Sequence, residues 1–143
     1  MTIDDKGRLM VPSEWRGRWD ASRDGEGWYC VPWTGRRLRL FTQRRFEGLL
    51  ELDRASQKLA PTSDETELLS ALCGEARFIA PDSAGRLTVP KDLTEFVRLG
   101  KEITLVGLGT FVEVRDRAEW NASREHRLAS LQALVERRDH PRA

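Results

Sequence analysis

An aspartate, a glycine and an arginine recur in this sequence with the same spacing in two places. The stretch TIDDKGRLMVP starts at Thr2, and APDSAGRLTVP starts at Ala80, 78 residues later. Glycine permits the positive φ of a tight turn, and aspartate can accept hydrogen bonds from the amides of that turn. An arginine directly after the turn can project outward, where its rigid fork of donors suits phosphates and guanine edges.

A purely structural interpretation of these residues stays open. Aspartate and arginine so close in sequence can form only a turn with a surface ion pair, which contributes little, and the aspartate can equally pair with an arginine of the other copy. The sequence has no phosphate-binding glycine loop, nucleophile elbow or metalloprotease helix. His126 and His140 stand without further metal ligands and are expected to be solvated. We therefore expect no enzyme, no cofactor and no metal.

Composition indicates a globular protein of 143 residues, 39% hydrophobic and 33% charged. No apolar run approaches the roughly 20 residues of a membrane span, and the N-terminus lacks the features of a signal peptide. The two cysteines form neither a disulfide framework nor a zinc quartet. We expect a cytoplasmic protein with no membrane partner.

Basic residues are unevenly distributed, although the net charge is only +1. Residues 1–45 carry ten Lys and Arg against six Asp and Glu, and the remainder carries fourteen against seventeen. Twenty of the 24 basic residues are arginine. This favours a nucleic-acid partner, but an arginine-rich composition also follows from the base content of a genome.

The likeness of the two stretches extends through an internal duplication. Gly35 and the residues after it align with Gly109 and the residues after it at an offset of 74, whereas the offset of the first stretch is 78. The first copy therefore has four extra residues, which we expect in a polar loop at 17–27. Each copy predicts a short strand, a helix with proline at its first position, and a hairpin whose second strand alternates buried and polar residues. The expected strands are 8–11, 28–33, 36–41, 86–89, 102–108 and 110–115.

Helices are expected to connect and end the copies. Residues 43–59 place an apolar stripe on one face, with Pro61 as the stop, and a second helix is expected to begin at Ser63 or Asp64 and end at Gly74. After Trp120 the chain is amphipathic, and its final six residues are expected to fray. The stripe residues are Phe46, Leu49, Leu50 and Leu52 in the first helix and Leu128, Leu131 and Leu134 in the last.

The doubled Asp-x-x-Gly-Arg, the run KEITLVGLG and the aromatic residue that closes each copy resemble the MraZ family of bacterial SpoVT/AbrB proteins, over nearly residues 1–121. The resemblance implies an α+β, mainly β fold. Two AbrB-like swapped-hairpin units of one chain pair into a small β-barrel, with connecting helices and a C-terminal helix. The expected domains are repeat 1 (1–45), a helical connection (46–74), repeat 2 (75–118), and a C-terminal helix and tail (119–143).

The resemblance also implies a function. Members of this family are ring-shaped homo-oligomers that bind direct repeats of double-stranded promoter DNA and regulate their own operon, the division and cell-wall gene cluster, which implies a nucleoid-associated protein. The rRNA methyltransferase encoded beside them is a further partner that the resemblance suggests. The alternative is an antitoxin-like or enzyme-modulating interaction module on the same barrel. The turn-positioning residues are expected to be Asp4, Gly7, Asp82 and Gly85, and the DNA-binding residues Arg8, Arg86 and Lys6.

Two departures from the family pattern carry further expectations. Only three residues precede Asp4, whereas EARFIA leads into Asp82. Either the true start lies upstream or the first strand is shortened, which would leave a sheet edge unpaired. Ala84 stands where the first copy has Lys6, so the two DNA-facing surfaces should differ in charge, and the first should contribute more to phosphate contact.

Overall fold

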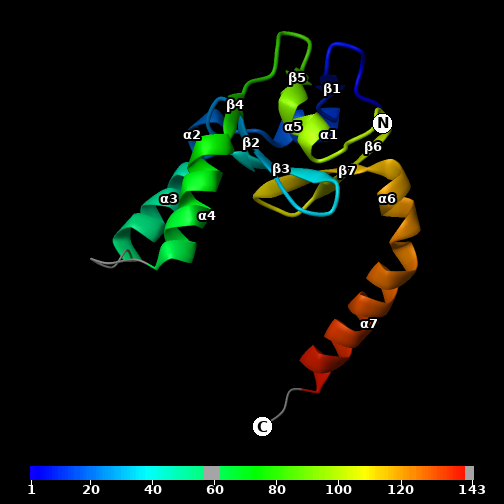
Figure 1. Ribbon diagram of the computed structural model, residues 1–143. Helices are drawn as coiled ribbons and strands as arrows, with labels where there is room; N and C mark the ends of the chain where they lie inside the picture. Colours follow the sequence, from blue (N-terminus) through cyan, green and yellow to red (C-terminus); the bar gives the residue numbers. More distant parts are fainter. Residues whose placement is uncertain (57–61, 141–143) are drawn as a thin grey trace.

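Short strands and helices alternate in the mixed α+β fold of the computed structural model, which describes residues 1–56 and 62–140 (Figure 1). In chain order the elements are β1 (Arg8–Met10), α1 (Ser13–Arg18), α2 (Ala21–Asp24), β2 (Trp28–Pro32), β3 (Arg37–Thr42), α3 (Gln43–Ser56), α4 (Ser63–Glu75), β4 (Arg77–Ile79), β5 (Arg86–Thr88), α5 (Lys91–Phe96), β6 (Ile103–Gly107), β7 (Phe111–Asp116), α6 (Arg117–Ala122) and α7 (Arg124–Asp139).

The strands of the described residues form a sheet of five and a separate ribbon of two. The sheet has the order β4-β2-β3-β7-β6, the ribbon pairs β1 with β5, and all these pairings are antiparallel. The predicted α+β class is therefore confirmed, but the expectation of a mainly β fold was wrong, because the helices contain more residues than the strands. The strand pairings among the described residues do not by themselves close the sheet and the ribbon into a barrel.

Equivalent strands of the two copies pair with each other. In the ribbon Leu9 lies opposite Leu87, its own counterpart at the offset of 78. In the sheet Arg39 of β3 lies opposite Glu113 of β7, its counterpart at the offset of 74. Both pairings are antiparallel and centred on equivalent residues, so the copies are related by an approximate twofold axis.

The core lies between the ribbon and one face of the sheet. Side chains alternate across a strand, and the even-numbered residues of β3 and β7 face this core, as the period-two pattern predicted. Leu93 of α5 is buried against the core, and the pseudo-equivalent Trp15 of α1 is packed against it more loosely. Burial of apolar area drives this packing. Its central residues are Leu9, Leu38, Leu40, Leu87, Val112 and Val114.

Two predictions of local structure were wrong, one about a loop and one about the start of a helix. The polar segment 17–27 contains the short helix α2, because the Asp20 side chain accepts a hydrogen bond from the Ser22 amide, 2.9 Å, and caps the first turn. The cap of α4 is Thr62, not Ser63 or Asp64. Its hydroxyl accepts from the Glu65 amide, 3.2 Å, and the Glu65 carboxylate accepts from the Thr62 amide, 3.1 Å.

The helices α3 and α4 form one arm of the molecule, and α6 and α7 form another (Figure 1). Phe46 of α3 is buried and stacks on Tyr29 of the sheet, with ring centroids 4.6 Å apart. Residues 57–61 of the predicted first helix and its stop lie outside the described residues, as do 141–143 of the tail and the side chain of Leu52. The helix predicted after Trp120 is confirmed as α7, but its leucines are exposed.

The segments that lead into the two turns differ in length. β4, which precedes the second turn, pairs with β2 over three residues. The segment before the first turn makes only the isolated bridge Thr2–Glu102 to the edge of the sheet, with the Ile3 amide donating to the Lys101 carbonyl at 2.8 Å. The β6 edge is thus covered over a shorter stretch than the β2 edge.

Candidate nucleic-acid interface

The first Asp-x-x-Gly-Arg segment folds into a turn that locks its own arginine. Oδ1 of Asp4 accepts hydrogen bonds from the amides of Lys6 and Arg8, at 3.0 and 2.9 Å. Oδ2 of Asp4 accepts from Nε of Arg8 at 2.8 Å. Gly7 has a φ of 79°, which only glycine adopts without strain, as the sequence predicted. The aspartate therefore fixes both the turn and the arginine that follows it.

The second segment repeats this geometry. Oδ1 of Asp82 accepts from the amides of Ala84 and Arg86, both at 2.9 Å, and Oδ2 accepts from Nε of Arg86, also at 2.9 Å. Gly85 has a φ of 81°. Each aspartate pairs with the arginine of its own copy, which decides between the two pairings that the sequence left open.

Hydrogen bonding keeps both aspartates ionised. The backbone amide of Arg8 is the strongest influence that lowers the pKa of Asp4, and the backbone amide of Arg86 has the same effect on the pKa of Asp82. Hydrogen bonds from the arginine side chains act in the same direction. The hydrogen bonds from Arg8 to Asp4 and from Arg86 to Asp82 therefore persist throughout the neutral pH range, with each carboxylate as the acceptor.

The locked arginines keep part of their guanidinium groups accessible. Each uses Nε for its aspartate, and the side chains of Arg8 and Arg86 remain 28% and 38% exposed. Within residues 1–56 and 62–140, neither arginine makes another side-chain hydrogen bond or ion pair through its two terminal nitrogens. These terminal nitrogens can donate to an outside acceptor.

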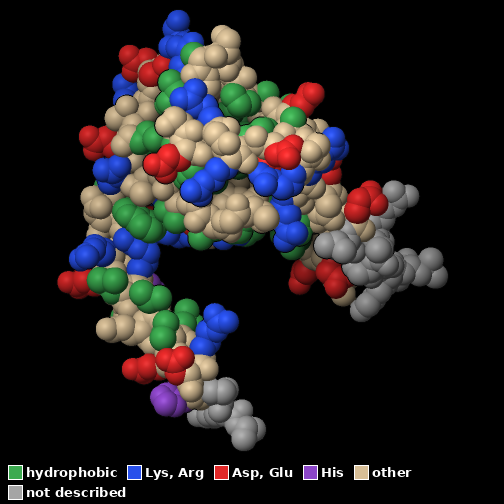
Figure 2. Space-filling view, turned by 180° about the vertical axis from the view of Figure 1, so that it is seen from behind, with side chains coloured by type: hydrophobic (Ala, Val, Ile, Leu, Met, Phe, Trp, Pro, Cys, Tyr) green, Lys and Arg blue, Asp and Glu red, His purple; other side chains and the backbone are tan. Residues whose placement is uncertain are grey.

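Because β1 and β5 pair antiparallel, the two turns lie at opposite ends of the ribbon, and both loops project from the same side of the molecule (Figure 1). Lys6 in the first turn is exposed, and its ammonium group has no ion-pair partner in the part of the chain that the structure describes. Its neighbour Asp5 pairs with Lys101 at 2.6 Å. Basic side chains reach the tip on this side, with carboxylates beside them (Figure 2). The structure thus places all seven site residues expected from the sequence in these two turns or directly after them.

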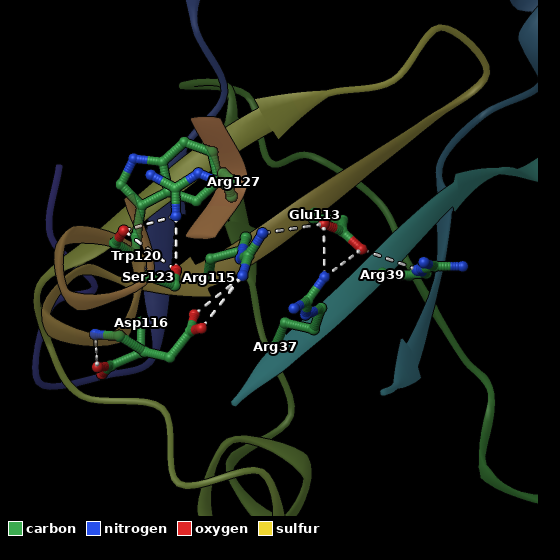
Figure 3. Close-up of polar contacts among 9 residues, drawn as sticks. Arg37, Arg39, Glu113, Arg115, Asp116, Trp120, Ser123 and Arg127 are labelled. Carbon is green, nitrogen blue, oxygen red and sulfur yellow. Dashed lines mark hydrogen bonds and ion pairs between the residues drawn. The ribbon is translucent and has the colours of Figure 1, made fainter. Parts of the chain in front are cut away.

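A second charged cluster, on the sheet face away from the core, was not expected (Figure 3). Glu113 is only 3% exposed. Its carboxylate accepts from Nη1 of Arg37 at 3.2 and 3.3 Å and from Nε of Arg39 at 3.0 Å, and Arg115 lies 3.9 Å away. The second strand of each hairpin was predicted to have a polar face. On β7 that face is buried as well.

Aromatic rings and the last two helices bury this cluster. The guanidinium of Arg39 lies 4.0 Å from the ring centroid of Trp33. Arg115 donates to Glu119 at 3.0 Å, and Trp120 lies between Arg115 and Arg127, 4.8 and 3.4 Å from its ring centroid. These contacts attach α6 to the sheet and α7 to α6. The sequence carries one signal for the cluster, because the repeat alignment sets an arginine at 39 against a glutamate at 113.

Other kinds of site find no support in the described residues. There, no three His, Cys, Asp or Glu side chains gather in a way that could hold a metal ion. A helix long and apolar enough to cross a membrane is likewise missing from that part of the chain. His126 and His140 are exposed, as predicted.

Together the fold and the site define a class: a duplicated α+β protein whose copies pair and present two matched turns, each with an aspartate-locked arginine. The family described as "MraZ protein, putative antitoxin-like" matches residues 72–140. "Transcriptional regulator MraZ" of Methylococcus capsulatus is 34% identical over 137 residues, 94% of this chain and 88% of that protein. Proteins of the same name from Micrococcus luteus and Coxiella burnetii are 31% and 28% identical, covering 83% and 90% of this chain and 78% and 84% of their own lengths. The chain belongs to the MraZ family.

Proposed function

We propose that this chain is a sequence-specific DNA-binding regulator of transcription, with no catalytic step of its own. One observation carries the proposal: two turns with the same hydrogen-bond pattern hold Arg8 and Arg86 on the ribbon face away from the core, each with terminal nitrogens that no described side chain binds. The relatives named as transcriptional regulators support the same function.

In this proposal the two arginines contact base edges in the major groove. A bidentate arginine–guanine contact discriminates against the wrong base by about 1–3 kcal/mol. Because Asp4 and Asp82 already hold the side chains in place, little conformational entropy is lost when DNA binds. Lys6 contacts a phosphate, which strengthens binding without adding sequence information.

Two arginine contacts in one chain cannot select a promoter from the roughly 10⁶–10⁹ competing sites of a genome. Linked binding events raise avidity by about 10²–10⁴. We therefore include in the proposal a ring-shaped homo-oligomer that binds direct repeats upstream of its own gene, in the division and cell-wall cluster, at the nucleoid in the cytoplasm.

The proposal also covers the domain plan and the fold of each copy. The first repeat spans 1–45 and the second 75–118, joined by the helical connection 46–74 and followed by the C-terminal helix and tail, 119–143. Each repeat is an AbrB-like swapped-hairpin unit, and the ribbon and the sheet together form the small barrel. The core that the ribbon shares with the sheet supports this arrangement.

The double variant Arg8→Ala/Arg86→Ala tests the function. Fluorescence anisotropy compares its binding to DNA from directly upstream of its own gene with binding to a scrambled duplex of equal length, at one salt concentration. We expect the ratio of the two affinities to fall at least about tenfold. The control is Arg137→Ala/Arg138→Ala, which removes two exposed arginines from α7, far from the turns. A folded Arg8/Arg86 variant with unchanged discrimination would refute the proposal.

An antitoxin-like or enzyme-modulating interaction module is the second candidate, and two observations favour it. The family description includes the word antitoxin-like, and α7 exposes hydrophobic side chains, seen along the lower left arm in Figure 2. Co-purification distinguishes the candidates. A stoichiometric protein, including the rRNA methyltransferase encoded nearby, supports the module, whereas bound duplex DNA supports the regulator.

A further inference from the structure

The two turns differ at the residue two positions after the aspartate, which is Lys6 in the first turn and Ala84 in the second. From sequence this leaves the second turn with one cation fewer. The structure places another cation there. A methyl carbon added to Gly85 would lie 2.7 Å from Nη1 and 2.9 Å from Cδ of Arg16, so this side chain rests directly on the second turn. A methyl carbon on Gly7 would meet only the Val89 carbonyl oxygen, at 3.1 Å.

Strand pairing explains why a residue of the first copy reaches the turn of the second. β1 and β5 are antiparallel, so the end of β1 lies beside the start of β5, and the Val11 amide donates to the Gly85 carbonyl at 3.1 Å. α1 begins two residues later, at Ser13. Its first turn therefore carries Arg16 to the second turn of the site. The same crossover brings α5 of the second copy towards the first turn.

The copies differ at this helix position. The counterpart of Arg16 at the offset of 78 is Thr94, which has no charge and whose hydroxyl donates to the Lys91 carbonyl at 2.9 Å. Arg16 is exposed, and in the described part of the chain its guanidinium makes no hydrogen bond or ion pair. Its donors are free, as is the ammonium group of Lys6 on the first turn.

We propose that Arg16 is the phosphate-contacting cation of the second turn, supplied by the first copy in place of the lysine that the second copy lacks. Each turn then presents one aspartate-bound arginine and one unpaired cation, so the two turns make equal numbers of contacts with DNA phosphates. This inference rests on the proposed DNA-binding function. It replaces the expectation from sequence that the first turn contributes more to phosphate contact.

Salt dependence of DNA binding tests the inference. The full chain and three variants, Arg16→Gln, Lys6→Gln and Arg16→Gln/Ala84→Lys, are titrated with duplex from directly upstream of its own gene, from about 50 to about 200 mM salt. The plot of log K against log salt falls with a slope whose magnitude counts phosphate contacts. Each lost contact reduces this magnitude, called the slope below, by about 0.9. Arg16→Gln should match Lys6→Gln, and its disadvantage against wild type should shrink about threefold over this range for each subunit that is bound to the DNA. Ala84→Lys should restore the slope.

Arg18→Gln is the matched control. Arg18 lies two residues further along α1, on nearly the opposite side of the helix, and is equally exposed. It should leave the slope unchanged. The inference is overturned if Arg16→Gln keeps the wild-type slope while Lys6→Gln lowers it, or if Ala84→Lys does not raise the slope of Arg16→Gln. If Lys6→Gln and Arg8→Ala/Arg86→Ala also bind like wild type, the proposed function itself fails.

Discussion

Neutralising Glu113 should be among the most destabilising single substitutions in this chain. Its carboxylate is the only anion in contact with Arg37 and Arg39 among the described residues, and it also lies 3.9 Å from Arg115, a side chain that is itself buried. Glu113→Gln keeps the shape but leaves these guanidinium groups facing one another with too little negative charge. Breaking a buried ion pair by removing one partner costs about 3–5 kcal/mol.

That loss is large against the roughly 5–15 kcal/mol of a typical domain. At about 2–8 °C per kcal/mol for domains of this size range, the midpoint of thermal unfolding should fall by roughly 6 °C or more. Circular dichroism during heating and during urea titration measures both quantities. A decrease of less than about 1 kcal/mol in the free energy of unfolding would show that the cluster is not an interacting unit, and the reasoning would be refuted.

Reversal of the central pair tests the same cluster directly. Arg39→Glu and Glu113→Arg each set like charges opposite one another in the β3–β7 register. The double variant Arg39→Glu/Glu113→Arg restores opposite charges and should recover a large part of the lost stability, so the coupling energy is favourable. The control reverses Lys91 and Glu95, an exposed pair at 3.8 Å, and should stay within about 0.5 kcal/mol.

Two further predictions concern thiols and helix capping. Burial raises the pKa of Cys30 to about 12, whereas the thiol ionises near 9.0 in the unfolded chain, so the free energy of unfolding should fall as pH rises from about 9 towards 12. At neutral pH a thiol reagent should label only the exposed Cys73, and rapid labelling of two thiols without denaturant would contradict this burial. Thr62→Ala should lower the free energy of unfolding by about 1 kcal/mol in urea, because it removes the capping box of α4. Ser63→Ala, at the position that the sequence suggested, should have little effect, and a larger loss there would mean that the cap is misassigned.

Local patterns predicted most of the secondary structure. The period-two alternation placed β3 and β7, because this signal depends on neighbouring residues only. The prolines placed the starts of α1 and α5 to within one residue, since Pro12 and Pro90 are the N-caps and not the first helical residues. Local reasoning failed where two structures compete over a few residues. α2 depends on the Asp20 cap within a polar segment, and the start of α4 depends on which of three adjacent capping residues completes a box with Glu65.

For the candidate site too, the local features could be predicted from the sequence and the contacts between the copies could not. The spacing of aspartate, glycine and arginine was enough to predict two turns, because the Asp4 and Asp82 hydrogen bonds span only four residues. Which arginine each aspartate binds was left open, because that depends on the distance between copies. The position of Arg16 could not be predicted, because its contact joins residues of different copies.

The sequence alone determined the duplication, the class of fold and the conformation of each turn, since all three are written in repeated residues and short-range hydrogen bonds. Tertiary structure decided that β1 lies against β5 and β3 against β7, and with it the position of Arg16 at the second turn and the burial of Glu113. These contacts join segments more than 60 residues apart. Such contacts depend on how the two copies bury their shared apolar faces, which no local pattern specifies.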